Sequence, residues 1–495
     1  MPWRPLAIAL LAAGVAAGCG GGAQSTTAAP VPDHGGRPPA RAAVAQNEDW
    51  PLFGITADRA NASRSARGLS AGTVGSLRRI RLQLPGTVDS SPIYLHAVRA
   101  GGATRDVFFV TTTYGRTLAL DARNGRLVWQ FTPPGIGSWQ GGYRITNASP
   151  AADPGRRWVF AASPDGLVHK LSVADGHEAR SGGWPVRVTR DPTHEKLTSS
   201  FNVSGRLLIV ATGGYIGDAP PYQGHVVTID RASGRIEGVF NSLCSNRRRI
   251  IAPSTCPSVQ SAIWSRSGAA VEPRTHRLLL ATGNGSDWNG HTDWPNSALL
   301  LSPTATRLLG HWTPPNEAAL SDSDTDVGST GPALLGGGLI VQSGKDARIR
   351  VLSERRLRAA GARPVKGGEL QSLPTPGGQG MFTAPAVWHH GGRTTMFATT
   401  GGGTAAYALR GARLHVVWQN GDAGTSPVVV GSLLLVQDPG GGLDVYRAGS
   451  GRHVARLDTG GGHWQSPVVG GGRILVAEGD ANSHSTSGSA SLFVP

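Results

Sequence analysis

One short phrase recurs eight times along the chain: a small residue, then proline or a substitute, then apolar residues. The complete copies are Ser91-Pro92, Ser149-Pro150, Ala384-Pro385, Ser426-Pro427 and Ser466-Pro467. Gly331-Pro332 changes only the small residue, whereas Ser199-Ser200 and Ser261-Ala262 lack the proline. Copies spaced a few tens of residues apart indicate a repeat architecture, because each unit is too small to bury a core alone.

The first copy shows what each repeat unit contains. Val107 to Thr111 and Thr117 to Leu120 have strand patterns and flank a turn at Tyr114-Gly115-Arg116. Asp121 to Gly125 predicts a hairpin turn, since aspartate accepts bonds from nearby backbone N–H groups and glycine takes positive φ. Leu127 to Phe131 is then a fourth strand. Four antiparallel strands make one propeller blade, so the chain predicts an all-β, eight-bladed β-propeller.

The last copy predicts how the ring closes. Pro467 to Val469, Arg473 to Ala477 and Ala490 to Val494 supply three strands. Leu77 to Leu84 alternates like a strand and has no blade of its own. We expect this N-terminal strand to complete the last blade, which leaves no free sheet edge at the seam.

Composition agrees with a propeller. Glycine occurs 71 times in 495 residues and charged residues make up only 16%, which suits many short strands joined by tight turns. No amphipathic helix of useful length is expected. Trp129, Trp312 and Trp418 fall in predicted fourth strands, where their large rings are expected to fill the gaps between neighbouring blades.

The formal net charge is +15 and comes mostly from arginine. A basic chain can bind nucleic acid or anionic lipid. However, the sequence has no basic helix and no regular alternation of arginine with aromatic residues. Arg247-Arg248-Arg249 is the only tight basic run and is interpreted as a solvated loop. We therefore expect no nucleic-acid partner.

The N-terminus is typical of an exported protein. Arg4 precedes the apolar run Leu6 to Val15, which is too short for a mature transmembrane helix. The small residues before Cys19 resemble a lipobox, so residues 1–18 are predicted to be a lipoprotein signal and Cys19 the lipidated residue; an ordinary signal peptide is the alternative. Residues 19–47 form a predicted flexible tether, and residues 48–495 a single propeller. The resulting prediction is a monomer secreted across the cytoplasmic membrane and lipid-anchored in the cell envelope or periplasm.

Two further cysteines, Cys244 and Cys256, lie twelve positions apart in a polar loop. In an oxidising compartment, a disulfide that closes this loop is the favoured interpretation. A zinc site is the alternative, but no histidine lies at ligand spacing.

The phrase Ala119-Leu120-Asp121, with Gly125 and Trp129 after it, resembles the repeat of pyrroloquinoline quinone (PQQ) propellers. The entry segment Asp49 to Gly54 resembles the start of quinoprotein dehydrogenases. This resemblance covers roughly residues 48–495 and implies the propeller fold. It is less specific for activity, because the lipoprotein scaffold of the outer-membrane β-barrel assembly machinery shares the repeat.

The middle blades carry a more specific resemblance to PQQ alcohol dehydrogenases, in family order. It implies that Trp264 stacks on the quinone ring and that Asn284 is a calcium ligand. It further implies that Asp326, in Asp324 to Gly328, is both the catalytic base and a calcium ligand, and that Lys345 bonds the quinone oxygens. The roles suit the chemistry, since Ca²⁺ takes oxygen ligands and a carboxylate can accept the alcohol proton.

Each of these residues also has a purely structural interpretation. Trp264 can be a wedge between blades, Asn284 a turn residue, Asp326 part of a solvated loop, and Lys345 part of a hairpin turn. The chain also departs from the family pattern. The segment Gly213 to Asp218, where the family has a calcium-binding glutamate, contains Asp218 as its only acid, and the family's adjacent cysteine pair is absent.

Two functions follow from these observations. The first is a quinoprotein dehydrogenase-like protein that oxidises an alcohol or sugar-like substrate with PQQ and Ca²⁺. The second is a non-catalytic propeller that binds an envelope protein as a scaffold. Fold alone cannot choose between them.

Overall fold

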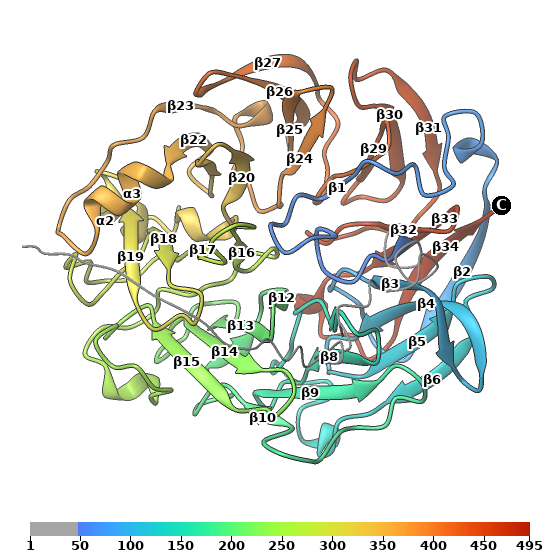
Figure 1. Ribbon diagram of the computed structural model, residues 1–495, viewed down its shortest axis with the longest axis horizontal. Helices are drawn as coiled ribbons and strands as arrows, with labels where there is room; N and C mark the ends of the chain where they lie inside the picture. Colours follow the sequence, from blue (N-terminus) through green and yellow to red (C-terminus); the bar gives the residue numbers. More distant parts are fainter. Residues whose placement is uncertain (1–47) are drawn as a thin grey trace, which may run out of the picture. The chain divides into compact units, whose positions relative to one another are not determined.

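Eight β-sheets stand in a ring around a central axis (Figure 1). The computed structural model describes residues 48–495, and the predicted leader, Cys19 and tether lie outside this range. The predicted all-β, eight-bladed propeller is confirmed.

The first four blades follow the chain order. Blade one contains β3 (Ile93–Ala100), β4 (Ala103–Thr111), β5 (Thr117–Asp121) and β6 (Leu127–Phe131). Blade two contains β7 (Ala151–Ala152), β8 (Trp158–Ala162), β9 (Leu167–Ser172) and β10 (Val186–Arg187). Blade three contains β12 (Asn202–Ser204), β13 (Leu207–Gly214), β14 (His225–Asp230) and β15 (Ile236–Asn241). Blade four contains β16 (Ala270–Val271), β17 (Leu278–Ala281), β18 (Ala298–Leu301) and β19 (Leu308–Trp312).

The second half of the ring repeats the pattern. Blade five contains β20 (Ala333–Gly336), β21 (Leu339–Gln342), β22 (Arg348–Ser353) and β23 (Gln371–Pro374). Blade six contains β24 (Ala386–His390), β25 (Arg393–Thr400), β26 (Gly403–Arg410) and β27 (Arg413–Asn420). Blade seven contains β28 (Val428–Val430), β29 (Leu433–Gln437), β30 (Leu443–Arg447) and β31 (His453–Leu457). Blade eight contains β32 (Val468–Gly470), β33 (Arg473–Glu478) and β34 (Gly488–Val494).

The ring closes as the sequence predicts. Strand β2 (Arg78–Leu84) pairs antiparallel with β34 and supplies the outermost strand of blade eight. Two blades carry an additional strand: β11 (Glu195–Leu197) pairs with the end of β13 in blade three, and β1 (Ala62–Ser63) pairs with β28 in blade seven.

The recurring phrase marks the start of a blade. In seven blades the innermost strand begins within a few residues of the small residue. Blade four is the exception, because its first strand begins at Ala270, nine residues after Ser261. The intervening loop carries Trp264 and Arg266 toward the centre of the ring, so the largest departure from the repeat supplies residues of the site described below.

Tryptophans in fourth strands join neighbouring blades, as predicted. The Trp129 indole in blade one donates to the Val173 carbonyl of blade two at 2.9 Å. A Cβ at Gly176 would lie 2.6 Å from the Trp129 ring, so the turn under this ring requires glycine. Trp418 makes the same contact with the carbonyl of Ala448 at 3.0 Å.

Replacing Trp129 with phenylalanine keeps an aromatic ring but leaves the Val173 carbonyl without its donor. We expect the free energy of unfolding to fall by about 1–3 kcal/mol, the cost of an unsatisfied buried polar group. Urea unfolding followed by circular dichroism measures this change. An unchanged midpoint would show that the indole hydrogen bond does not stabilise this junction.

The segment from Trp50 to Arg67 crosses the ring centre on the side of the turns between first and second strands (Figure 1). Its backbone forms hydrogen bonds with the innermost strands of several blades. Examples are the bonds between Trp50 and Tyr94 and between Asn61 and Val429. Buried Arg59 donates to the carbonyls of Ser200 and Phe201 at 2.9 Å each. The segment therefore covers the middle of the ring from this side.

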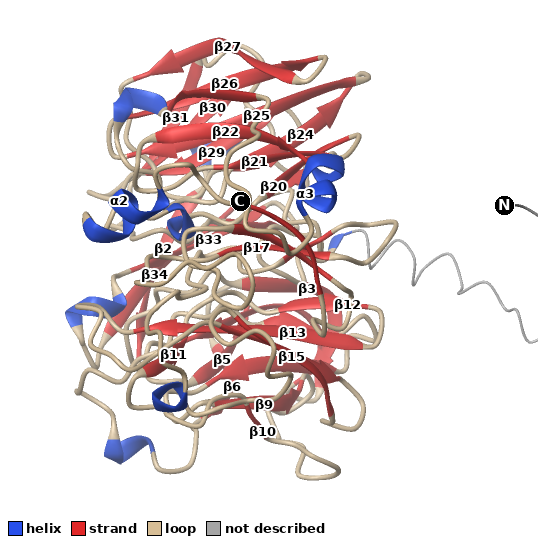
Figure 2. Cartoon of the chain, turned by 90° about the vertical axis from the view of Figure 1, so that its left-hand side faces the viewer, coloured by secondary structure: helices blue, strands red, loops and turns tan. Residues whose placement is uncertain are grey.

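Helices are short. Helix α2 (Glu317–Asp322) follows the last strand of blade four, and α3 (Glu354–Ala360) follows the third strand of blade five, so they lie on opposite faces of the ring (Figure 2). Within residues 48–495, no helix has the length and apolar character needed to cross a membrane.

Candidate functional site

A cavity of about 210 Å³ lies where loops of six blades converge. Strand direction alternates within a blade, so the loops after second strands and the connections between blades emerge on one face. These loops line the cavity with Asn147, Lys196, Thr198, Gly214, Tyr215, Ile216, Gly217, Asp218, Ala262, Trp264, Asn284, Asp324, Lys345, Phe382, His463, Trp464 and Asn482. The cavity is thus a feature of the ring as a whole and not of one blade.

The structure brings the predicted site residues together. Trp264, Asn284 and Lys345 line the cavity, and Asp326 lies fully buried beside two of them. The Trp264 indole donates to Asp326 Oδ2 at 3.1 Å, and Lys345 Nζ lies 2.8 Å from Asp326 Oδ1. The Lys345 ammonium also lies 5.0 Å from the centre of the Trp264 ring and pairs with exposed Asp324.

Glycines permit this convergence. A Cβ at Gly328 would lie 2.4 Å from the backbone nitrogen of Gly283, and one at Gly344 would lie 2.5 Å from the Asp326 carbonyl oxygen. Only glycine allows such close approach of backbones. The loops that carry Asn284, Asp326 and Lys345 therefore pack directly on one another.

Burial and pairing set the charge of this group. Burial raises the pKa of Asp326, although Lys345 and the Trp264 indole both favour the ionised carboxylate. Burial by itself lowers the pKa of Lys345, but the carboxylates of Asp326 and Asp324 together outweigh it and raise the pKa. The carboxylate is held by the ion pair with Lys345 and by two hydrogen bonds, since the backbone N–H of Gly328 also donates to Oδ2 at 2.8 Å.

The donor set does not provide a site for Ca²⁺. Asp326 Oδ2 accepts from the Trp264 indole and the Gly328 backbone, and the ammonium of Lys345 lies 2.8 Å from Oδ1, where a cation would neutralise the carboxylate. Asp218 accepts a bond from the Tyr222 hydroxyl at 2.7 Å. Within residues 48–495, no group of three close acidic, histidine or cysteine ligands includes Asp326. Calcium prefers six to eight oxygens, so binding by Asn284 and Asp326 stays a prediction that this arrangement does not support.

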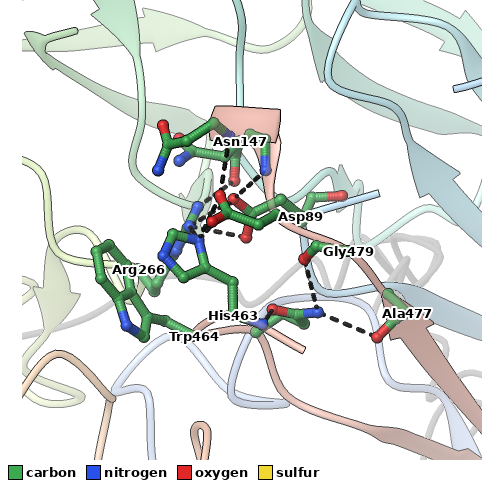
Figure 3. Close-up of polar contacts among 12 residues, drawn as sticks. Asp89, Asn147, Arg266, His463, Trp464, Ala477 and Gly479 are labelled. Carbon is green, nitrogen blue, oxygen red and sulfur yellow. Dashed lines mark hydrogen bonds and ion pairs between the residues drawn. The ribbon is translucent and has the colours of Figure 1, made fainter. Parts of the chain in front are cut away.

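A second buried charge cluster borders the cavity and was missed by sequence reasoning (Figure 3). Asp89, before blade one, accepts two bonds from the Arg266 guanidinium at 2.7 and 2.8 Å. His463 Nδ1 lies 2.9 Å from Asp89 and 3.2 Å from Asp480. Burial would raise the pKa of Asp89, but Arg266 and His463 outweigh it and lower the pKa. The cluster links blades one, four and eight.

Aromatic side chains form one wall of the cavity. Phe382 and Trp464 stack with ring centres 4.8 Å apart, and Trp264 tilts against both at 6.1 and 5.8 Å. The Arg266 guanidinium lies 5.2 Å from the centre of the Trp464 ring. A cavity with an aromatic wall and lysine ammonium groups suits a flat, anionic ligand.

The predicted disulfide is confirmed. Cys244 and Cys256 are joined, with Cα atoms 6.1 Å apart. Cys244, Cys256, Leu243 and Ile251 form a small buried cluster, so the bridge holds the loop between blades three and four onto the ring.

The chain folds as an eight-bladed β-propeller and is similar to proteins with PQQ-type repeats. The family model described as "Outer membrane protein assembly factor BamB" matches residues 77–239. The predicted resemblance to PQQ-repeat propellers is therefore confirmed.

Individual known proteins are also similar to this chain. The quinone alcohol dehydrogenase subunit of Acetobacter aceti is 23% identical over 239 residues, which span 42% of this chain and 31% of that protein. The match thus reaches less than a third of that relative's length. The quinohemoprotein alcohol dehydrogenase of Pseudomonas putida HK5 has a TM-score of 0.67, 16% identity, and coverage of 92% of this chain and 81% of that one. A europium-containing methanol dehydrogenase has a TM-score of 0.66, 13% identity, and coverage of 92% and 100%. At these identities the structural likeness establishes the fold alone.

Proposed function

We propose that this protein is an extracytoplasmic quinoprotein dehydrogenase that binds PQQ in its central cavity and oxidises a small alcohol or sugar-like substrate. One observation carries the proposal: Trp264, Asn284 and Lys345 line a single central cavity, and Asp326 is bonded to two of them. These four residues are spread over more than eighty positions and meet because blades four and five pack side by side.

The residues of the cavity suit PQQ, which is flat and anionic. Trp264 offers an aromatic face, and Lys345 a donor for the quinone oxygens. The bound orthoquinone would supply the hydride acceptor for alcohol oxidation. Asp326 would take the hydroxyl proton of the substrate on Oδ1.

Asp326 is buried behind Lys345, so proton acceptance requires a rearrangement. Lys345 Nζ, which lies 2.8 Å from Oδ1, has to turn toward an anionic ligand in the cavity to free that oxygen. Trp264 and the Gly328 backbone would still hold Oδ2 and keep the carboxylate oriented. In this proposal, ligand binding prepares the base.

Removal of divalent metal is expected to leave PQQ affinity and the thermal unfolding midpoint unchanged, because Lys345 already neutralises Asp326. The two quantities are measured after dialysis against EDTA and again after addition of Ca²⁺. PQQ binding that required Ca²⁺ would contradict this expectation and restore Asn284 and Asp326 as ligands.

Turnover tests the activity itself. Purified protein is supplied with PQQ, and reduction of an artificial dye is followed with a panel of primary alcohols and sugars, with and without Ca²⁺. Substrate-dependent dye reduction supports the proposal. PQQ that binds without turnover of any substrate would leave a cofactor-binding protein and reject the dehydrogenase.

A second candidate is a non-catalytic propeller that binds an envelope protein. The family-model match to an outer-membrane assembly factor over residues 77–239 favours it. Both candidates place the protein outside the cytoplasm, with Cys19 as the proposed lipid anchor in the cell envelope or periplasm. Metabolic labelling with a radioactive fatty acid, lost in Cys19→Ala, tests the anchor.

A further inference from the structure

Lys196 is aimed into the cavity by the extra strand of blade three. Strand β11 pairs antiparallel with the end of β13, and successive side chains on a strand point to opposite faces. Glu195 points into the protein, where its carboxylate lies 3.0 Å from His225 Nε2 with both side chains fully buried. Lys196 therefore points the other way and lines the cavity.

The Lys196 ammonium is buried without a partner. Lys196 is only 7% exposed. Among residues 48–495 no group accepts a hydrogen bond from its Nζ or forms an ion pair with it, and the carboxylates of Asp89, Asp218 and Asp480 act on it only from a longer distance. Its nearest described interaction is with the ring of Tyr215, whose centre is 5.8 Å away. Burial of an unpaired charge is costly, so such a group points to a ligand.

Neighbouring acids are already engaged. Asp89 accepts bonds from Arg266 and pairs with His463, which also pairs with Asp480. Asp218 accepts from Tyr222. The other lysine that lines the cavity, Lys345, is paired with Asp324 and Asp326. Of the two lysines that line the cavity, Lys196 is therefore the one whose ammonium can pair with a bound anion.

We propose that Lys196 forms a carboxylate-binding subsite of the cavity, which selects flat aromatic ligands that bear a carboxylate. The inference rests on the proposed function, because it assigns Lys196 to a carboxylate of the bound PQQ. The ligand's ring would lie against the aromatic wall formed by Trp264, Phe382 and Trp464, and its carboxylate would accept from Lys196 Nζ.

The subsite predicts a pH dependence of binding. Burial, reinforced by the nearby Arg266, lowers the pKa of Lys196 to about 8. The ammonium is therefore mostly charged at pH 7 and mostly neutral at pH 9, and anion affinity is expected to fall about tenfold between them. The other charged or titratable groups that face this part of the cavity are Asp89, Tyr215, Asp218, Arg266, His463 and Asp480. A variant that lacks only Lys196 keeps all of these groups, so any pH dependence of binding that remains in the variant comes from them.

The test compares wild type, Lys196→Met and Lys170→Met. Lys170 is equally buried, at 7% exposed, but lies outside the cavity and donates to the carbonyls of Arg231 and Ala232. PQQ, PQQ trimethyl ester and 2,6-naphthalenedicarboxylate are titrated while tryptophan fluorescence is followed. We expect Lys196→Met to weaken PQQ binding about ten- to a hundredfold and to abolish the change between pH 7 and 9. Lys170→Met should match wild type, and the ester should bind wild type and Lys196→Met equally weakly.

The outcomes separate this inference from the proposed function. If Lys196→Met binds PQQ as tightly as wild type, the subsite is rejected and the cofactor proposal stands. If wild type binds the naphthalene dicarboxylate through Lys196 but not PQQ, the subsite stands and the cofactor proposal falls. If wild type binds no carboxylate probe, both are rejected. Unfolding midpoints of the two variants confirm that each is folded.

Discussion

Asp326→Asn is expected to reduce the rate of alcohol-dependent dye reduction by about 10²- to 10⁴-fold, the usual contribution of a positioned general base. The substitution keeps the shape of the side chain and can still accept from the Trp264 indole and the Gly328 backbone. It removes the charge that accepts the proton and that pairs with Lys345. PQQ affinity should change much less than the rate, since Asp326 does not line the cavity.

Asp324→Asn is the matched control. Asp324 also pairs with Lys345, but its side chain is 60% exposed, and exposed pairs contribute little. We expect its rate to stay within a few-fold of wild type.

The rate of dye reduction by the wild type should also depend on pH. Burial raises the pKa of Asp326, so lowering the pH should protonate its carboxylate and reduce the rate. Equal rates for Asp326→Asn and wild type would exclude Asp326 as the base.

Asp89→Ala is expected to lower the free energy of unfolding by about 3–5 kcal/mol, because it leaves the buried Arg266 guanidinium uncompensated. The double variant Asp89→Leu with Arg266→Met removes both charges and should recover most of this loss. Urea unfolding of the two variants measures the difference. A double variant no more stable than Asp89→Ala would show that the charges themselves are required.

Asp458→Ala serves as the control for an exposed pair. Asp458 pairs with Arg79, but its side chain is 86% exposed, so its loss should cost less than about 1 kcal/mol.

The contribution of Asp89 to the free energy of unfolding should also depend on pH. Arg266 and His463 hold the pKa of Asp89 below its ordinary value despite burial, so its stabilisation is present at neutral pH and is lost below about pH 4.

Much of the fold follows from local sequence rules. The hairpin from Thr117 to Phe131 has two strands, β5 and β6, with bounds within a residue of those expected, because its turn chemistry is local. The pairing of β2 with β34 is distant in sequence but predictable, since the last repeat lacked one strand. The segment from Trp50 to Arg67 was not predicted to cross the ring, because its contacts are made by single backbone groups of many blades.

The site was predictable only in part. Trp264, Asn284, Asp326 and Lys345 lie in short motifs that resemble a family, but whether they line one cavity depends on how the blades pack. Lys196, Asp89, Arg266 and His463 lie in no such motif, and their relation depends on which loops face one another. A signal existed for Arg266 alone, because the loop after Ser261 departs from the repeat.

We propose that the cavity binds a flat anionic cofactor of the PQQ type. The most direct measurement is a titration of purified protein with PQQ, followed by quenching of tryptophan fluorescence and by isothermal calorimetry. We predict saturable binding of one PQQ per chain. The double variant Trp264→Ala with Lys345→Ala should bind PQQ much more weakly. Trp418 lies in the outer strand β27, so Trp418→Phe should leave binding unchanged. Absence of saturable binding, or binding that the cavity variants leave unchanged, would contradict the claim.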